Sequence, residues 1–171
     1  DATLLRAIDS VLCQTYENCE VIVVDDNDPD TEYRKRTEDL MEKYRGNHRV
    51  KYIKHEKNKN GSAARNTAFR NSSGEYLCFL DDDDYFLPDK IKKQVEHMEK
   101  NPKCGATYTW RYETLFNQNI LIHSNYVGDL TKQILTLEFT PLTSSLMLKR
   151  DSYIKLNGFD ESFVRHQDFE F

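Results

Sequence analysis

The feature that most restricts the fold is a pair of short apolar runs, each of which ends abruptly in acidic residues. The run over residues 20–24 ends at Asp25 and Asp26, and the run over residues 75–80 ends at four consecutive aspartates, residues 81–84. The first run is continuous rather than alternating, which is typical of a parallel strand covered on both faces. The sequence therefore predicts two buried strands whose carboxyl ends carry charge.

Helical patterns separate these strands. Apolar residues recur at helical spacing over residues 3–13, which predicts an amphipathic helix. Strand and helix alternate through the first hundred residues, which favours an α/β protein with a largely parallel sheet. The second half is more mixed. The other predicted elements are helices over 31–44, 62–71 (with Ser62 as the N-cap), 88–100 and 150–156, and strands over 50–53, 104–110, 120–122 and 145–148.

Composition excludes several classes of protein. A chain of 171 residues is the size of one domain, and charges of both signs are interspersed as on a folded surface. The net charge of −5 argues against sequence-independent binding of nucleic acid, which needs a basic stripe. No apolar run is long enough for a membrane span. The four cysteines contain no C-x-x-C pair, so a zinc site is not expected. Their number and spacing instead predict reduced thiols in a cytoplasmic protein.

The two acidic clusters point to chemistry at one edge of the sheet. Ligands of open α/β sheets bind outside the carboxyl ends of the strands, so both clusters should lie at the same rim. Carboxylates converge where a divalent cation or ligand hydroxyl and N–H groups offset their repulsion, and oxygen ligands favour Mg²⁺, Mn²⁺ or Ca²⁺ over zinc. Two alternatives remain open at this point: a solvated acidic turn at 81–84, and a turn with a helix cap at 25–26.

Taken together, several ordered blocks of the sequence resemble the family 2 glycosyltransferases, of the type that builds bacterial cell-surface polysaccharides. The resemblance is close over residues 7–90 and looser over 100–157, where the family varies with its acceptor. The blocks are Ser10–Tyr16, Glu20–Asp26, Asn60–Asn66, Ser73–Asp84, Pro88–Lys90, Gly158–Glu161 and Gln167–Phe171.

This resemblance implies the GT-A fold, a Rossmann-like three-layer α/β/α arrangement around a mixed, mainly parallel sheet. It implies one domain over residues 1–171, with a nucleotide-sugar-binding half (1–100) and an incomplete acceptor-side half (101–171). The family begins with a further apolar strand and continues beyond the last block. The chain is therefore expected to be truncated at both ends.

The resemblance also assigns roles in binding the sugar donor. Asp26 matches the aspartate that accepts a hydrogen bond from the nucleotide base, and Asp25 either supports the turn or contacts the substrate. Arg65 lies in the segment that lines the donor pocket, where it either faces the diphosphate or serves as a scaffold arginine.

Asp81, Asp82 and Asp83 occupy the D-x-D motif of the family. Asp83, with Asp81, would hold the Mn²⁺ or Mg²⁺ that bridges the diphosphate, and Asp81 and Asp82 would contact the ribose or metal-bound water. Asp168 matches the position of the catalytic base.

The implied function is transfer of a sugar, with inversion, from a nucleoside diphosphate sugar to a hydroxyl of a glycan or a lipid-linked saccharide. UDP-sugars are the favoured donors, and no nucleic acid partner is expected. The implied location is the cytoplasm, and enzymes of this type commonly work at the inner face of the cell membrane, which is compatible with peripheral association.

Two alternatives to this function stay open. A sugar nucleotidyltransferase would also be a metal-dependent α/β protein, although no Gly-rich phosphate loop is present in the sequence. A truncated, non-catalytic nucleotide-binding module is the other alternative. A calcium-binding acidic loop is excluded because the D-x-D-x-D-G ladder with its terminal glutamate is missing.

Overall fold

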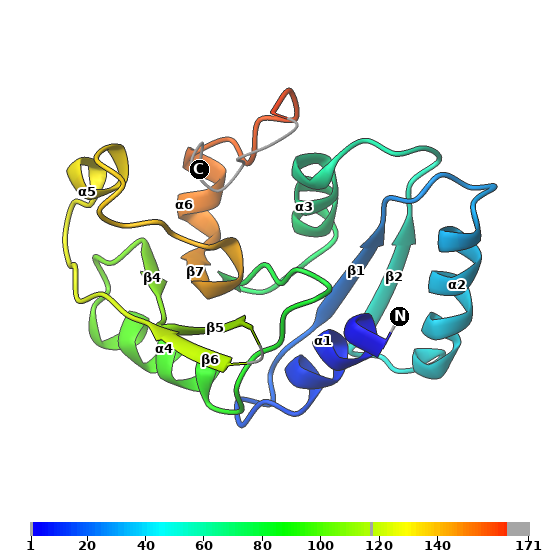
Figure 1. Cartoon of the computed structure of the whole chain (residues 1–171), viewed down its shortest axis with the longest axis horizontal. Helices are drawn as coiled ribbons and strands as arrows, with labels where there is room; N and C mark the ends of the chain where they lie inside the picture. Colours follow the sequence, from blue (N-terminus) through cyan, green and yellow to red (C-terminus); the bar gives the residue numbers. More distant parts are fainter. Residues whose placement is uncertain (1, 117, 164–171) are drawn as a thin grey trace.

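Two groups of strands form the middle layer of the structure, and helices cover both faces of this layer (Figure 1). This computed structural model describes residues 2–116 and 118–163. In chain order the elements are α1 (Ala2–Leu12), β1 (Val21–Asp25), α2 (Glu32–Met41), the 3₁₀ helix η1 (Glu42–Tyr44), β2 (Val50–Lys54), α3 (Gly61–Arg70), β3 (Tyr76–Leu77), α4 (Lys90–Lys100), β4 (Ala106–Tyr108), β5 (Arg111–Leu115), β6 (Gln118–Ile122), α5 (Thr131–Leu135), the 3₁₀ helix η2 (Thr143–Ser145), β7 (Leu146–Lys149) and α6 (Arg150–Lys155).

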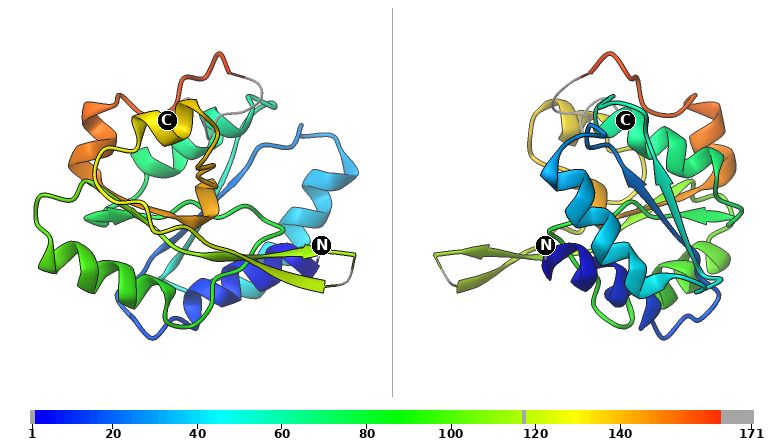
Figure 2. Two further views of the ribbon diagram at one scale, coloured as in Figure 1. Left: turned by 60° about the vertical axis from the view of Figure 1, so that its left-hand side comes forward. Right: turned by 90° about the vertical axis from the view of Figure 1, so that its right-hand side faces the viewer.

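The first group is the parallel pair β1–β2, in which Val21 lies beside Val50. Val21 and Val23 pack with Ile8 of α1 and Met41 of α2 into one apolar cluster. Helix α3 also contacts β1, and it lies on the side away from α2 (Figure 2). Helices therefore cover β1 on both faces, as its continuous apolar run predicts.

The second group has the order β3–β7–β4, with β7 antiparallel to both neighbours. Successive residues point to opposite faces. Tyr76 and Met147 pack in the apolar cluster that includes α4, whereas Leu77 and Leu148 pack against Tyr153 of α6. Both faces of this group are therefore buried too, which makes three layers.

The direction of the strands differs in part from the expectation. Among the described residues, one ladder is parallel (β1–β2) and three are antiparallel (β3–β7, β4–β7 and β5–β6). Strands β3 and β4 point the same way, as expected for strands joined through a helix, but β7 lies between them and runs in the opposite direction. The mainly parallel sheet predicted from the sequence is therefore limited to β1–β2 in the described ladders.

Several boundaries also differ. Strand β3 is shorter than the predicted 75–80, since only Tyr76 and Leu77 form ladder pairs, both with β7. The N-cap of α3 is Asn60 rather than Ser62: the Asn60 side chain accepts a hydrogen bond from the Ala63 N–H at 3.1 Å. Strand β5 and helix α5 were not predicted. The β5–β6 hairpin projects from the rest of the structure (Figure 2), so no core contact imposes a pattern on it.

Helix α3 is joined to the chain after α6 through the side chain of Asn66. Its Oδ1 accepts from the Tyr153 hydroxyl (2.6 Å) and the Phe159 N–H (3.0 Å), and its Nδ2 donates to the Phe159 carbonyl and a Glu161 carboxylate oxygen, both at 2.9 Å. A Cβ at Gly158, which has φ +73°, would lie 2.6 Å from Asn66 Oδ1. Glycine is therefore required at position 158 by both its backbone angle and this close approach.

We expect Asn66→Ala to lower the free energy of unfolding by about 2–4 kcal/mol, because it leaves several buried polar groups unpaired. Chemical denaturation of both proteins measures this difference. The matched control is Asn71→Ala at the exposed end of the same helix, which should change stability by less than about 0.5 kcal/mol. Equal effects of the two substitutions would contradict the role given to Asn66.

Candidate active site

Helix α3 connects the two acidic clusters that the sequence singles out. The backbone N–H of its N-cap residue, Asn60, donates to Asp26 Oδ2 at 2.8 Å. Further along the same helix, Arg65 Nη2 lies 3.0 Å from Asp81 Oδ1. The acidic ends of β1 and β3 therefore flank one helix at one edge of the middle layer, as the sequence predicts.

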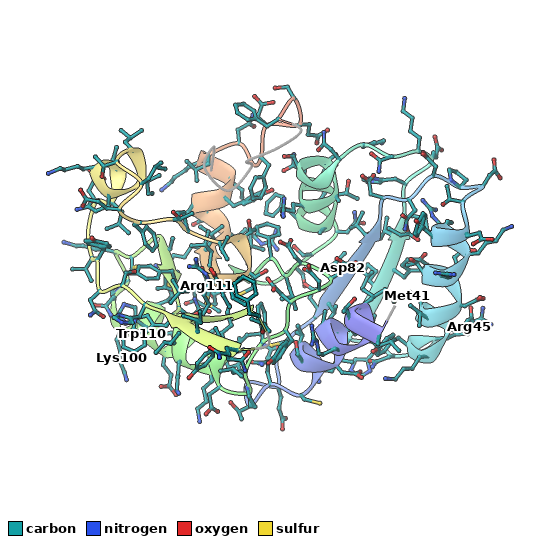
Figure 3. All side chains as sticks on the ribbon, in the orientation of Figure 1. Met41, Arg45, Asp82, Lys100, Trp110 and Arg111 are labelled. Atoms are coloured by element: carbon teal, nitrogen blue, oxygen red, sulfur yellow. The ribbon has the colours of Figure 1, made fainter. Side chains whose placement is uncertain are left out.

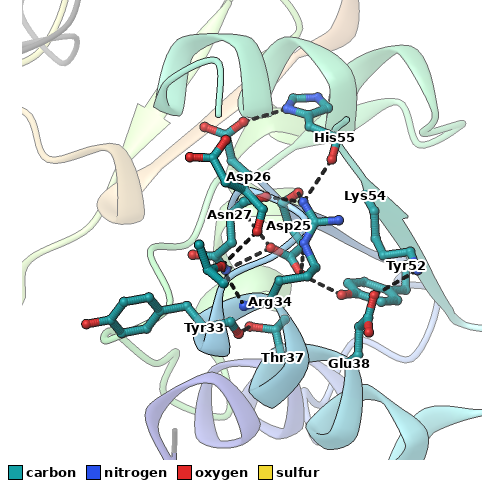
Figure 4. A network of polar contacts seen from close by, with 12 residues as sticks. Asp25, Asp26, Asn27, Tyr33, Arg34, Thr37, Glu38, Tyr52, Lys54 and His55 are labelled. Carbon is teal, nitrogen blue, oxygen red and sulfur yellow. Dashed lines mark hydrogen bonds and ion pairs between the residues drawn. The ribbon is translucent and has the colours of Figure 1, made fainter. Parts of the chain in front are cut away.

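The Asp25 carboxylate is enclosed in a network of polar contacts (Figure 4). It forms an ion pair with Arg34 of α2 (Oδ2 to Nε, 3.2 Å), and its side chain is 0% exposed. It also accepts from the Tyr52 hydroxyl of β2 at 2.5 Å and from the backbone and side-chain N–H groups of Asn27. Asp25 thus supports the turn, one of its two predicted roles. The predicted contact of Asp25 with substrate is not supported, because no part of its side chain is open to a ligand.

The neighbours of Asp25 are fixed by the same network. The Arg34 guanidinium also donates to the backbone carbonyls of Asn27 and His55, the latter at 2.8 Å. Burial and the hydrogen bond to Asp25 raise the pKa of the Tyr52 hydroxyl above its usual range, so it stays a donor at neutral pH. Helix α2 and the ends of β1 and β2 are therefore held in one arrangement.

The Asp26 carboxylate lies in a cradle of donors and keeps a side-chain exposure of 17%. The Lys59 and Asn60 backbone N–H groups donate to it at 2.9 and 2.8 Å, and His55 Nδ1 lies 2.7 Å from Oδ1. The other ring nitrogen of His55 lies 2.9 Å from the Thr67 hydroxyl of α3. The carboxylate is therefore oriented by the protein and still reaches solvent.

The four aspartates after β3 form an exposed turn. The Asp84 N–H donates to the Asp81 carbonyl at 3.1 Å, and the Asp81 N–H donates to the Ser144 hydroxyl at 3.2 Å. Arg6 of α1 donates to the Asp83 carbonyl at 2.6 Å. These contacts use the backbone of the turn, so that within the described residues the carboxylates of Asp82, Asp83 and Asp84 have no hydrogen-bond or ion-pair partner.

Arg65 stands between the acidic turn and the chain after α6. Its guanidinium pairs with Asp81, with side-chain exposures of 17% and 50%, and it lies 5.4 Å from the centre of the Phe159 ring. Both roles predicted for Arg65, facing a diphosphate and serving as scaffold, are compatible with this position. The ion pair places a positive charge beside the acidic turn.

The donor set of the turn fits a hard divalent cation that is shared with a phosphorylated ligand. Within residues 2–116 and 118–163, no three acidic, His or Cys side chains are grouped as a complete metal cage. Mg²⁺ is usually held by one or two carboxylates together with substrate phosphates and water, and an exposed aspartate turn provides such ligands. Asp83 and Asp81 remain the residues that would hold it.

The predicted catalytic base, Asp168, lies outside the described residues. The chain that leads to it is positioned by α3, because the Asn60 side chain donates to the Glu161 carbonyl at 2.8 Å, in addition to the contacts of Asn66. The described chain therefore passes beside the N-terminus of α3, near Asp26.

Sequence reasoning missed several residues that shape the site. Arg34 is one of several charged residues of α2, and no spacing distinguishes it from its solvated neighbours. His55 directly follows β2, in the same position relative to its strand as Asp26 has after β1, and this was the one available signal. Arg6 and Ser144 reach the acidic turn from distant parts of the chain.

Comparisons with known proteins identify the family of this chain. The profile described as "Glycosyl transferase family 2" matches residues 1–157, and the chain belongs to this family. It is 32% identical over 172 residues to an uncharacterized glycosyltransferase of Methanocaldococcus jannaschii, with 98% of this chain and 58% of the relative covered. It is 26% identical over 179 residues to the amylovoran biosynthesis glycosyltransferase AmsB of Erwinia amylovora, with 98% and 58% covered. The chain thus spans somewhat more than half of these relatives.

Solved structures show the same fold. TarS 1–349 of S. aureus in complex with UDP aligns with a TM-score of 0.75 at 20% identity, covering 98% of this chain and 49% of that one. The mannosyltransferase PcManGT of Pyrobaculum calidifontis, in complex with GDP-Man and Mn²⁺, aligns with a TM-score of 0.68 at 17% identity, covering 98% and 46%. The chain therefore has the GT-A fold expected from the sequence. No helix in the described part of the chain has the length and apolar character needed to cross a membrane.

We expect Arg34→Met to destabilise the protein by about 3–5 kcal/mol, because it leaves the buried Asp25 carboxylate without its cation. The double variant Asp25→Asn/Arg34→Met should recover part of this loss, since no buried charge remains unpaired. Urea denaturation provides the measurement, with Arg45→Met as control. Arg45 pairs with Glu42 at an exposed site, so its loss should cost at most about 1 kcal/mol. A single Arg34 variant as stable as the control would show that the network is dispensable.

Proposed function

We propose that the protein transfers a sugar from a UDP-sugar to a hydroxyl group of a glycan or lipid-linked saccharide in cell-surface polysaccharide synthesis. The observation that carries this proposal is the pair of acidic groups flanking α3: one oriented carboxylate at Asp26 and an exposed aspartate turn at 81–84. The similarity to AmsB and to a UDP-Glc-dependent glucosyltransferase of Escherichia coli, WfgD (30% identical, 91% of this chain and 64% of the relative covered), supports the polysaccharide context.

The nucleotide base is proposed to bind at Asp26. Three donors from the protein fix the carboxylate, and its exposed part can still accept a hydrogen bond. The imide N–H of uracil is a donor of the kind that an aspartate accepts. A site whose acceptor is oriented before binding loses little entropy when the base arrives.

The diphosphate is proposed to bind at the acidic turn. Asp83 and Asp81 would hold a Mn²⁺ or Mg²⁺ ion, and Asp82 would contact the ribose or metal-bound water. When bound, such an ion would offset the negative charge that develops on the departing diphosphate. Arg65 and Arg6 bring two positive charges to the same turn, and these favour an anionic ligand.

The transfer itself is proposed to be a single displacement at the anomeric carbon. The acceptor oxygen forms the new bond to this carbon as the bond to the diphosphate oxygen breaks, and the hydroxyl proton passes to Asp168. A single carboxylate base, with no second carboxylate acting as a nucleophile, leads to inversion.

We further propose that residues 1–171 act as one domain, in which residues 1–100 bind the nucleotide sugar and residues 101–171 face the acceptor. Because lipid-linked acceptors are held by the membrane, the proposed place of action is the cytoplasm, at the inner face of the cell membrane. Neither proposal requires nucleic acid.

Calorimetric titration with UDP, with and without Mn²⁺, tests the proposed donor site. Binding should require the metal, and Asp83→Asn should weaken it at least tenfold because a direct metal ligand is lost. The control is Asp30→Asn, which makes the same change of charge in an exposed turn after β1 and should leave binding unchanged. Metal-independent binding, or equal losses in both variants, would refute the assignment of Asp83.

Asp168→Ala should lower turnover by about 10²–10⁴-fold, the usual contribution of a positioned general base, while UDP affinity stays the same. Turnover is measured as release of UDP from a UDP-sugar in the presence of a saccharide acceptor. The outcome that rejects this role is unchanged turnover in the variant.

A further inference from the structure

A pocket lies apart from Asp26, where β5 begins and β6 ends. Its volume is about 180 Å³, and its lining includes Thr109, Trp110, His123, Glu138 and Ser145. This is smaller than the roughly 300–1,000 Å³ of sites for drug-sized ligands, so it suits one small ring rather than a whole chain.

Trp110 forms an exposed but fixed aromatic surface in this pocket. Its indole N–H donates to the Ser124 carbonyl at 2.9 Å, and the His123 ring lies 5.3 Å from it, centre to centre. The residue is nevertheless 52% exposed. The polar end of the ring is thus satisfied by the protein, and what remains available to a ligand is its apolar face.

The wall beside Trp110 is rigid. The Tyr108 ring packs on buried Phe139 at 4.6 Å, and its hydroxyl donates to the Tyr126 carbonyl at 3.0 Å. The Ser124 hydroxyl donates in turn to the Tyr108 oxygen at 3.1 Å. The same segment that anchors the indole therefore anchors this wall, so the pocket exists before any ligand binds.

The polar groups of the pocket that remain available are few. Within the described residues, the Glu138 carboxylate and the ring nitrogens of His123 form no hydrogen bond or ion pair. This combination suits a pyranose ring, which has an apolar face for the aromatic surface and hydroxyls at its edge for the carboxylate and the imidazole. The C–H groups of one face of such a ring pack on an aromatic surface, and the hydroxyls at its edge bind carboxylate and imidazole.

The pocket is physically connected to the acidic turn. Ser145 lines the pocket, and its neighbour Ser144 accepts the hydrogen bond from the Asp81 N–H at 3.2 Å. Both belong to η2, so one short element contacts both sites. Figure 3 places Trp110 and Arg111 at the start of β5 and Asp82 on the side toward β1.

From these observations we infer that the Trp110 pocket binds one pyranose ring of the saccharide acceptor, with Trp110 as the stacking surface and Glu138 as the hydroxyl acceptor. This inference rests on the proposed function, because it places the sugar acceptor beside the donor site. It makes Trp110 and Glu138 determinants of acceptor specificity rather than of UDP binding.

The test is saturation-transfer NMR of the protein with the methyl β-glycosides of glucose, galactose, mannose and N-acetylglucosamine, combined with UDP titration. At least one glycoside should bind, with saturation strongest on the C–H groups of one ring face. Trp110→Ala should weaken this binding about tenfold, and Trp110→Phe should restore most of it because an aromatic face remains. Glu138→Gln should weaken it by a smaller factor.

The matched control is Tyr112→Ala. Tyr112 is a similarly exposed aromatic residue of the same hairpin (59%) that does not line the pocket, and its loss should change neither measurement. UDP affinity should be the same in all variants. Trp110 is the single tryptophan of the sequence, so its fluorescence gives an independent reading of glycoside binding in the unsubstituted protein.

The inference is overturned if no glycoside of the panel binds, if Trp110→Ala binds glycoside as well as the unsubstituted protein, or if Trp110→Ala weakens UDP instead, which would make the pocket a nucleotide site. Failure of the proposed function gives a different result: glycoside binding that depends on Trp110, without any binding of UDP.

Discussion

The buried contact between Asp25 and Arg34 is the interaction on which the candidate site depends. A carboxylate with no exposed surface is stable only when a cation and hydrogen-bond donors surround it. These partners come from α2, β2 and the turn after β1, so the energetic requirement of one side chain fixes three segments. Burying Asp25 also fixes the end of β1, and the next residue, Asp26, keeps a side-chain exposure of 17%.

Helix α3 connects Asp26 to the other parts of the candidate site. Its N-cap, Asn60, binds both Asp26 and the backbone of Glu161, and two adjacent residues of the helix contact different parts of the site. Arg65 pairs with the acidic turn after β3, while Asn66 is enclosed by the chain after α6. A single short helix thus sets the distances between the acidic end of β1, the turn after β3 and the segment that continues toward Asp168.

The elements of the fold that could be predicted from the sequence are those marked by local patterns of residues. The strands β1 and β2 and the helices α1, α2 and α4 were predicted because apolar runs, helical spacing and the residues that begin and end helices are local signals. The insertion of β7 between β3 and β4 was not, because it depends on a contact between segments about seventy residues apart that no local pattern records.

The candidate site divides in the same way. The acidic residues stand out because they end apolar strands, so Asp26 and the turn 81–84 could be named from the sequence. Arg34 could not, since an arginine in a charged helix is usually solvated. The place of His55 directly after β2 was the one signal for it, and this signal is weak because a histidine after a strand is usually solvated too. The rigid position of Trp110 likewise depends on a backbone carbonyl fourteen residues away, which only the fold brings close.

The aspartates of this chain show why satisfied and unsatisfied polar groups carry different information. Asp25 has all of its partners inside the protein, so its contribution is to stability. In the described part of the chain, the carboxylates of Asp82, Asp83 and Asp84 have no partners. The hydrogen bonds that hold their turn are made to its backbone instead. Holding three like charges together while leaving them open costs electrostatic energy, which a bound cation would recover. Glu138 and His123 beside the anchored Trp110 likewise form no hydrogen bond or ion pair within the described residues. Polar groups without protein partners are thus found near η2 in both places, where Ser144 contacts the acidic turn and where Ser145 lines the Trp110 pocket, and these are the parts of the fold most suited to substrate.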